Sequence, residues 1–88
     1  MPMRKILYFY ARECPPCKFY KKQFIEPLEQ LAGKEKIQHI NAKDYPFIAE
    51  QYSVERLPTL ILLEGSQVVL RRSGAIDIEE LLDYLQKE

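Results

Sequence analysis

The chain has 88 residues, 47% of them hydrophobic and 30% charged, and its 13 basic and 13 acidic residues give a formal net charge of zero. This length and composition are typical of one globular domain, so we expect residues 1–88 to form a single domain. The balanced charge argues against nucleic acid and anionic membranes as partners. No window reaches the ~18 apolar residues of a membrane span. Only six uncharged residues separate Lys5 from Arg12, too few for a secretory signal, so we expect a cytoplasmic protein.

The first third of the chain predicts a strand followed by a long helix. Residues 4–11 are nearly all apolar or aromatic, which is typical of a central strand covered on both faces. A helix begins near Pro15, because proline is tolerated in a first turn, and we expect Gly33 to end it. Pro27 lies inside this helix, so we expect a kink or a restart near Glu26. The apolar side chains expected to face the core are Phe19, Tyr20, Phe24, Leu28 and Leu31.

The middle of the chain predicts a short strand, a helix and a β-hairpin. Residues 37–42 form the strand, and a helix follows from about Tyr45 to Tyr52, with Asp44 as a candidate N-cap. Residues 58–63 are apolar throughout and therefore indicate another central strand. A tight turn leads from it into residues 68–71, which gives an antiparallel hairpin.

The last helix carries the clearest local signature. Asp77 lies at the N-cap position with Glu80 three residues later, a capping box in which Asp takes the Ser/Thr role. Ile76 and Leu81 occupy the two positions of a hydrophobic staple. The predicted order is therefore β-α-β-α-β-β-α, an α/β fold. Because the first crossover is right-handed and the terminal hairpin antiparallel, we expect a four-stranded mixed sheet with helices on both faces.

The only two cysteines, Cys14 and Cys17, lie at the junction of the first strand and the first helix. Residues i and i+3 of a first helical turn are neighbours, at a separation that suits a disulfide. Cys14 faces the unpaired N–H groups of the helix, which favour the thiolate that attacks a disulfide. In a reducing cytosol an isolated pair of thiols is typical of catalysis. The pattern predicts a redox-active pair that needs no cofactor and no metal.

Other uses of the two cysteines stay open at this point. A zinc site usually has four ligands, and with His39 as the only histidine it would need carboxylates or a second chain. An iron–sulfur cluster shared by two chains would also use the pair. A purely structural disulfide would close too short a loop to restrict the unfolded chain strongly. The alternative function is thus a binding protein whose cysteines hold a metal or a cluster between two chains.

Several segments together resemble the thioredoxin superfamily over nearly the whole chain. They are the strand Ile6–Ala11, the motif Cys14-Pro15-Pro16-Cys17-Lys18, the triplet Leu57-Pro58-Thr59, the hairpin, and Ser73-Gly74-Ala75. The resemblance implies a minimal fold without the extra N-terminal strand and helix of full-length thioredoxins, with sheet order 2-1-3-4. It implies that the Leu57–Pro58 bond is cis beside Cys14, and that Leu57, Pro58 and Gly74 line the substrate groove.

The resemblance also implies a function, that of a thiol–disulfide oxidoreductase in electron transport. Cys14 would attack a disulfide of a protein or a small thiol, and Cys17 would then attack the mixed disulfide and release reduced substrate. The expected partners are a disulfide-containing protein and an electron donor, either a reductase or glutathione. We expect the protein to act as a monomer.

Three departures from the family pattern surround the motif. Glu13 stands where thioredoxins carry tryptophan, and Pro15 replaces the usual glycine, followed by a longer helix. Tyr8 stands where thioredoxins bury the aspartate that accepts the proton of the second thiol, so the base is unidentified. Lys18 favours a thiolate at the first cysteine and Glu13 opposes it. The simpler interpretations are that Glu13 points into solvent and that Tyr8 is a core residue. These departures indicate a thioredoxin-like or glutaredoxin-like relative instead of a housekeeping thioredoxin.

Overall fold

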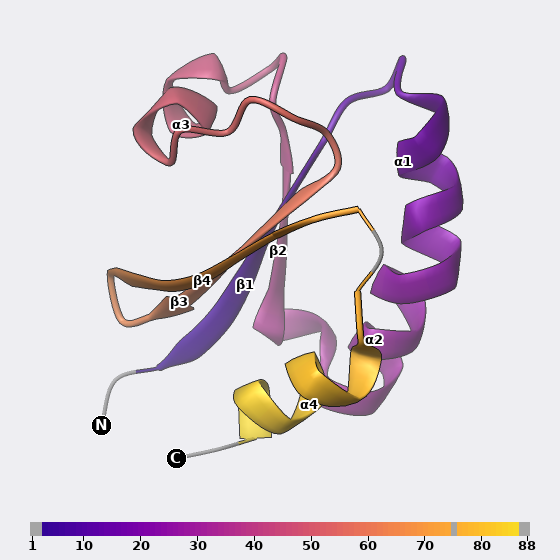
Figure 1. Ribbon diagram of the computed structural model, residues 1–88, viewed down its shortest axis with the longest axis vertical. Coiled ribbons are helices and arrows are strands. Elements are labelled where there is room, and N and C mark those ends of the chain that lie inside the picture. The colour runs from indigo at the N-terminus through magenta and orange to yellow at the C-terminus, as the bar shows by residue number, and fades with distance from the viewer. Residues whose placement is uncertain (1–2, 75, 87–88) are drawn as a thin grey trace.

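A four-stranded mixed sheet forms the centre of the molecule in the computed structural model, which describes residues 3–74 and 76–86 (Figure 1). The strands lie in the order β2-β1-β3-β4. β1 runs parallel to β2 and antiparallel to β3, and β3 pairs with β4 as an antiparallel hairpin. The strand bounds are Arg4–Tyr10 for β1, Ile37–Asn41 for β2, Thr59–Glu64 for β3 and Gln67–Ser73 for β4. The predicted fold class and strand order are confirmed.

Helices cover both faces of this sheet (Figure 1). α1 (Pro15–Tyr20), the π turn η1 (Lys21–Ile25) and α2 (Glu26–Ala32) follow one another without a break, and the short 3₁₀ turn η2 (Lys34–Lys36) leads into β2. α4 (Ile78–Gln86) lies on the same face as α2, and α3 (Pro46–Gln51) lies on the other. No helix within the described part of the chain is both long and apolar enough to cross a membrane.

The side chains of β1 supply two separate cores, because successive residues of a strand point to opposite faces. Ile6 and Tyr8 pack toward α1, α2 and α4, together with Tyr20, Leu28 and Leu81. The other face is held by a smaller cluster under α3, made of Leu7, Phe9, Ile40, Ala49, Ile61 and Leu63. The near-continuous apolar sequence of β1 is thus explained by burial on both faces.

The long helix restarts at Glu26 as expected, but its buried face differs from the prediction. The N–H of Glu26 donates to the carbonyl of Lys21, five residues earlier, which defines the π turn. Pro27 has no N–H and its ring conflicts with a regular helical turn, and a π turn relieves that conflict. After the π turn the buried face follows Ile25, Leu28 and Ala32, which are three and four residues apart, so Leu31 lies off this face and is 59% exposed.

Phe19 was also wrongly assigned to the core. Cys17 and Tyr20, three residues apart, define the buried side of α1, and both are 3% exposed. Phe19 lies off that side and is 64% exposed.

The predicted helix ends are only partly confirmed. Gly33 ends α2 with a positive φ of 103°, where glycine is favoured. The Oδ1 atom of Asp77 accepts the N–H groups of Glu79 and Glu80 at 3.0 and 3.3 Å, so the predicted cap of α4 is confirmed. The predicted Asp44 cap of α3 is wrong, because Tyr45 is the N-cap residue and makes no side-chain cap bond.

Candidate active site

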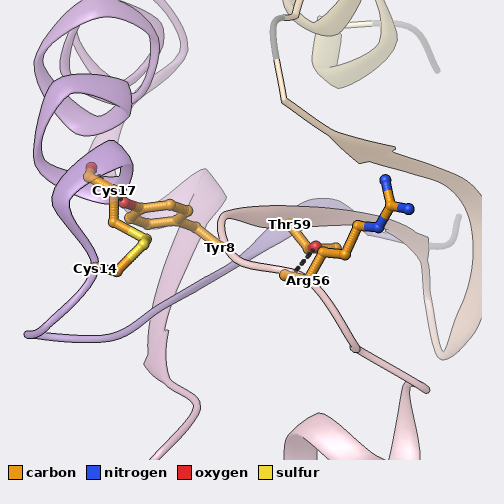
Figure 2. The surroundings of a disulfide bond; sticks show 5 residues. All are labelled: Tyr8, Cys14, Cys17, Arg56 and Thr59. Carbon is orange, nitrogen blue, oxygen red and sulfur yellow. Dashed lines mark hydrogen bonds between the residues drawn. A yellow bond between two sulfur atoms is a disulfide. The ribbon is translucent and has the colours of Figure 1, made fainter.

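Cys14 and Cys17 form a disulfide at the start of α1, with their Cα atoms 5.2 Å apart (Figure 2). Cys14 is the N-cap residue and has extended backbone angles, and its carbonyl accepts the N–H of Cys17 at 3.0 Å. Pro15 and Pro16 fill the first two helical positions, where a missing N–H leaves no bond unmade. The four residues of the motif thus build a tight turn that brings the two sulfur atoms together.

The two cysteines differ in exposure. Cys14 is partly exposed, whereas Cys17 lies within the first helical turn and is 3% exposed. The positive end of α1 adjoins Cys14, which favours a thiolate at that position once the disulfide is reduced. A molecule that approaches from solvent meets Cys14 first.

Tyr8 of β1 lies directly behind the disulfide (Figure 2). Its side chain is buried, and its hydroxyl donates to the backbone carbonyl of Cys17 at 3.2 Å. The ring stacks on Tyr10 and Tyr20, with centroids 5.3 and 6.1 Å away, and the ring of His39 meets it edge-on. Burial, with a smaller contribution from Tyr10, raises the pKa of Tyr8 to about 12. The phenol is therefore neutral at ordinary pH and cannot take a proton from a thiol.

The loop before β3 forms another side of the site. The Leu57–Pro58 peptide bond is cis, Leu57 is half-buried and Pro58 is buried. Thr59 is buried; its hydroxyl donates to the carbonyl of Arg56 at 2.5 Å and lies 2.9 Å from the hydroxyl of Ser73 (Figure 2). These contacts fasten the loop to β4.

Gly74 lies immediately after β4, with a φ of 80° that L side chains rarely adopt. A Cβ atom built there would meet no heavy atom within 4 Å, so the space beside its backbone is open. Ala75, which completes the motif quoted for this region, lies outside the described residues.

The segment before Cys14 is tied to the loop that follows β2. The carboxylate of Glu13 pairs with Lys43 at 3.3 Å, and Arg12 pairs with Asp44 at 3.9 Å. The Glu13 and Lys43 side chains are 83% and 67% exposed, so this interaction is strongly screened by water and salt. Glu13 thus lies in solvent with a cation beside it, as the simpler interpretation of the sequence suggested.

A cavity of about 160 Å³ lies beside the buried cysteine, and its lining includes three cationic side chains. It is lined by Tyr8, Tyr10, Ala11, Arg12, Cys17, Lys18 and Lys21. The sequence-based predictions assign no role to Lys21 and miss this arrangement. A signal for it was present, because Lys21 follows Cys17 by four residues and so shares its helical face.

His39 lies on the outer strand β2 and its Nε2 atom is 2.8 Å from Oε2 of Glu29 in α2. Both side chains are largely buried, with 28% and 12% exposed. Within residues 3–74 and 76–86 no group of three or more histidine, cysteine, aspartate or glutamate side chains is placed to hold a metal ion. His39 packs against the rings of Tyr8 and Tyr10 and pairs with Glu29, so it joins β2 to α2.

Comparison with known proteins identifies the family. The thioredoxin family model matches residues 3–87. Thioredoxin of Haemophilus influenzae is 33% identical over 82 residues, which cover 93% of this chain and 77% of that protein. Thioredoxin Y1 of Arabidopsis thaliana, a chloroplastic protein, is 33% identical over 78 residues, 89% of this chain, but the chain spans only 45% of its length.

Solved structures give the same fold. Thioredoxin-2 of the malaria parasite superposes with a TM-score of 0.80 at 23% identity, covering 99% of this chain and 84% of that one. At this level of identity the match concerns the fold alone.

Proposed function

This chain belongs to the thioredoxin family and is a thiol–disulfide oxidoreductase, and we propose that Cys14 is its nucleophile and Cys17 its resolving thiol. The difference in exposure of the two sulfur-bearing residues carries this assignment. Cys14 is partly exposed at the helix N-terminus, whereas Cys17 is buried within the first helical turn. The helix end stabilises a thiolate at Cys14, and the thiolate is the attacking form.

The reaction proceeds in two exchanges. The Cys14 thiolate attacks one sulfur of a substrate disulfide, and the other substrate sulfur leaves as a thiolate and is protonated by water. Cys17, as a thiolate, then attacks the Cys14 sulfur of the mixed disulfide, and the bond from Cys14 to the substrate breaks. The substrate has gained two electrons and two protons, and the protein ends with the Cys14–Cys17 disulfide seen in Figure 2.

We propose a disulfide-containing protein as the substrate, bound along Leu57, Pro58 and Gly74. Two observations support this groove. Hydrogen bonds of Thr59 hold the loop that carries Leu57 and Pro58 in place. Beside Gly74 the backbone borders open space, where an extended chain can approach closely.

A second partner must return the protein to its dithiol form. A reductase or glutathione would supply the two electrons, which makes the protein a carrier in electron transport. Both cysteines of the sequence belong to the motif, which is typical of a reducing compartment and supports a cytoplasmic location.

We propose further that the protein acts as a monomer, which its mass in solution would test, and that residues 1–88 form one domain. The Cα radius of gyration is 12.1 Å. A compact single domain of this length is expected to have a value of about 12 Å.

Reduction of insulin with dithiothreitol as the electron donor tests the proposed function. The wild-type protein should accelerate precipitation of the insulin B chain, and Cys14→Ser should abolish the acceleration. Cys17→Ser should instead accumulate a mixed disulfide with the substrate, visible by mass spectrometry, because the resolving step is missing. A Cys14→Ser protein that still forms the mixed disulfide would contradict the assignment.

A further inference from the structure

The buried thiol Cys17 lacks a base behind it. Tyr8 occupies that position, and its hydroxyl already donates to the Cys17 carbonyl. Because burial raises the pKa of Tyr8 to about 12, the phenol stays protonated while the protein works. Glu13, the carboxylate nearest in sequence, is 83% exposed and pairs with Lys43. Neither Tyr8 nor Glu13 therefore provides an acceptor for the proton of Cys17.

Cations, in contrast, line the cavity beside Cys17. The charged and titratable groups that line the cavity with Cys17 are Tyr8 and Tyr10 from β1, Arg12 from the following loop, Lys18 from α1 and Lys21 from η1. Arg12 is 3.9 Å from Asp44 and is mostly exposed. Within the described residues Lys18 and Lys21 belong to none of the ion pairs, although Lys21 also lines a neighbouring hollow with Glu26 and Glu29.

The backbone explains why Lys21 lies here. It follows Cys17 by one helical turn, so both side chains lie on one face of the continuous helix formed by α1 and η1. Lys21 is also the first residue of the π turn that Pro27 imposes, and its carbonyl accepts the N–H of Glu26. The Lys21 side chain is exposed, so solvent reaches the outer side of the cavity.

We infer that Lys21, with Lys18 and Arg12, stabilises the thiolate of Cys17 across this cavity, and that the proton of Cys17 leaves to solvent water instead of to a buried acid. The inference rests on the proposed role of Cys17 as the resolving thiol. In the mixed disulfide the Cys17 S–H bond breaks and its proton passes to a water or hydroxide at the cavity. The sulfur then attacks Cys14, and the electron pair of the broken bond leaves on the substrate sulfur.

A titration of Cys17 alone tests this inference. In a Cys14→Ser background Cys17 is the only thiol, and its ionisation is read from thiolate absorbance near 240 nm. Lys21→Gln should raise the pKa of Cys17 by roughly half a unit at low salt, and 0.5 M salt should reduce this shift. Lys21→Arg should keep the parent value, because it keeps the charge.

Two further variants distinguish the charge of Lys21 from a general change in surface charge and from the hydroxyl of Tyr8 as the cause of a shift in the pKa of Cys17. Lys22→Gln removes a neighbouring charge that does not line the Cys17 cavity, although Lys22 shares an adjoining cavity with Lys18 and Lys21, so it should change the pKa of Cys17 far less than Lys21→Gln does. Tyr8→Phe should also leave it nearly unchanged, because a neutral phenol contributes little charge. If Lys21→Gln misfolds, Lys18→Gln provides the same measurement on a second cation.

The same variants have a kinetic consequence. At a pH below the pKa of Cys17, a pKa raised by half a unit lowers the thiolate fraction about threefold. The more basic thiolate is also a better nucleophile, which recovers part of the lost rate. Resolution of a mixed disulfide should therefore slow about twofold. Above the pKa the difference should vanish or reverse. Equal Cys17 titration curves for Lys21→Gln and Lys22→Gln would overturn the inference. A shift of one unit or more in the pKa of Cys17 in Tyr8→Phe would overturn it as well. Failure of the proposed function itself would appear separately, in the insulin assay of the two cysteine variants.

Discussion

The hydroxyl of Tyr8 donates to the backbone carbonyl of Cys17 across 3.2 Å, from the strand that lies behind the disulfide. Where family members place a buried carboxylate, this protein has a neutral donor that holds the helix backbone instead of a base. Tyr8 therefore helps to hold Cys17 in position, and the charge that favours the Cys17 thiolate comes from the cations of the cavity that Tyr8 also lines.

Tyr8→Phe should destabilise the protein while leaving disulfide reduction intact. The change keeps the stacked ring and removes one buried hydrogen bond, which is worth about 1 kcal/mol in the free energy of unfolding. Urea unfolding of the oxidised protein measures it. Tyr10→Phe is the matched control, since Tyr10 is only half-buried, and it should change the free energy of unfolding by less than about 0.5 kcal/mol. A loss of insulin reduction in Tyr8→Phe would contradict a purely positioning role.

The raised pKa of Tyr8 also predicts a pH dependence of stability. The unfolded phenol ionises near its model value of 10.0, whereas the folded one ionises at about 12. The unfolded state therefore releases a proton first as the pH rises, so stability present below pH 10 is lost between pH 10 and about 12. Subtracting the unfolding free energies of Tyr8→Phe from those of the wild type isolates this contribution. A difference that does not vary over this window would contradict it.

Glu13→Gln should scarcely affect the nucleophile. The carboxylate is 83% exposed and has Lys43 beside it, so its field at Cys14 is screened. In a Cys17→Ser background we expect the pKa of the Cys14 thiol to fall by less than about half a unit at 0.1 M salt. Absorbance near 240 nm against pH gives the value. A fall of one unit or more would mean that Glu13 turns toward the sulfur once the disulfide is reduced.

Thr59→Val should weaken both the fold and substrate binding. Valine keeps the shape but loses the hydroxyl that bonds Arg56 and Ser73, and the loss of these partly buried hydrogen bonds should cost about 1 kcal/mol. The loop with Leu57 and Pro58 is then less firmly held, so the KM for a protein disulfide should rise. Thr59→Ser keeps the hydroxyl and should retain most of both properties. Equal KM values for the two variants would show that the loop does not depend on this contact.

Much of the fold could be predicted because its signals are local. The apolar run of β1, the cap of Asp77 and the ending at Gly33 each follow from a few adjacent residues, and the cysteine spacing placed the disulfide at a strand–helix junction. The buried face of the long helix could not be read in the same way. A π turn precedes Pro27, and after this turn Leu28 and Ala32 pack on the core whereas Leu31 is exposed.

The rest of the site depends on contacts between distant segments. Asp44 is a favourable N-cap residue by type, yet the side chain of Asn41 accepts the N–H groups of Lys43 and Asp44, and this turn places Tyr45 at the cap position. The cationic cavity joins β1, the following loop, α1 and η1, and no single stretch of sequence displays that combination.

Alkylation of the reduced protein tests the central claim, that Cys14 is the nucleophile, most directly. The protein is treated with limiting iodoacetamide at neutral pH, and the position of the adduct is mapped by mass spectrometry, with a urea-unfolded sample as the reference for intrinsic reactivity. Because Cys14 is partly exposed at the helix N-terminus and Cys17 is 3% exposed, we predict that the adduct forms predominantly on Cys14 in the folded protein and on both cysteines in urea. Preferential labelling of Cys17 in the folded protein would contradict the account.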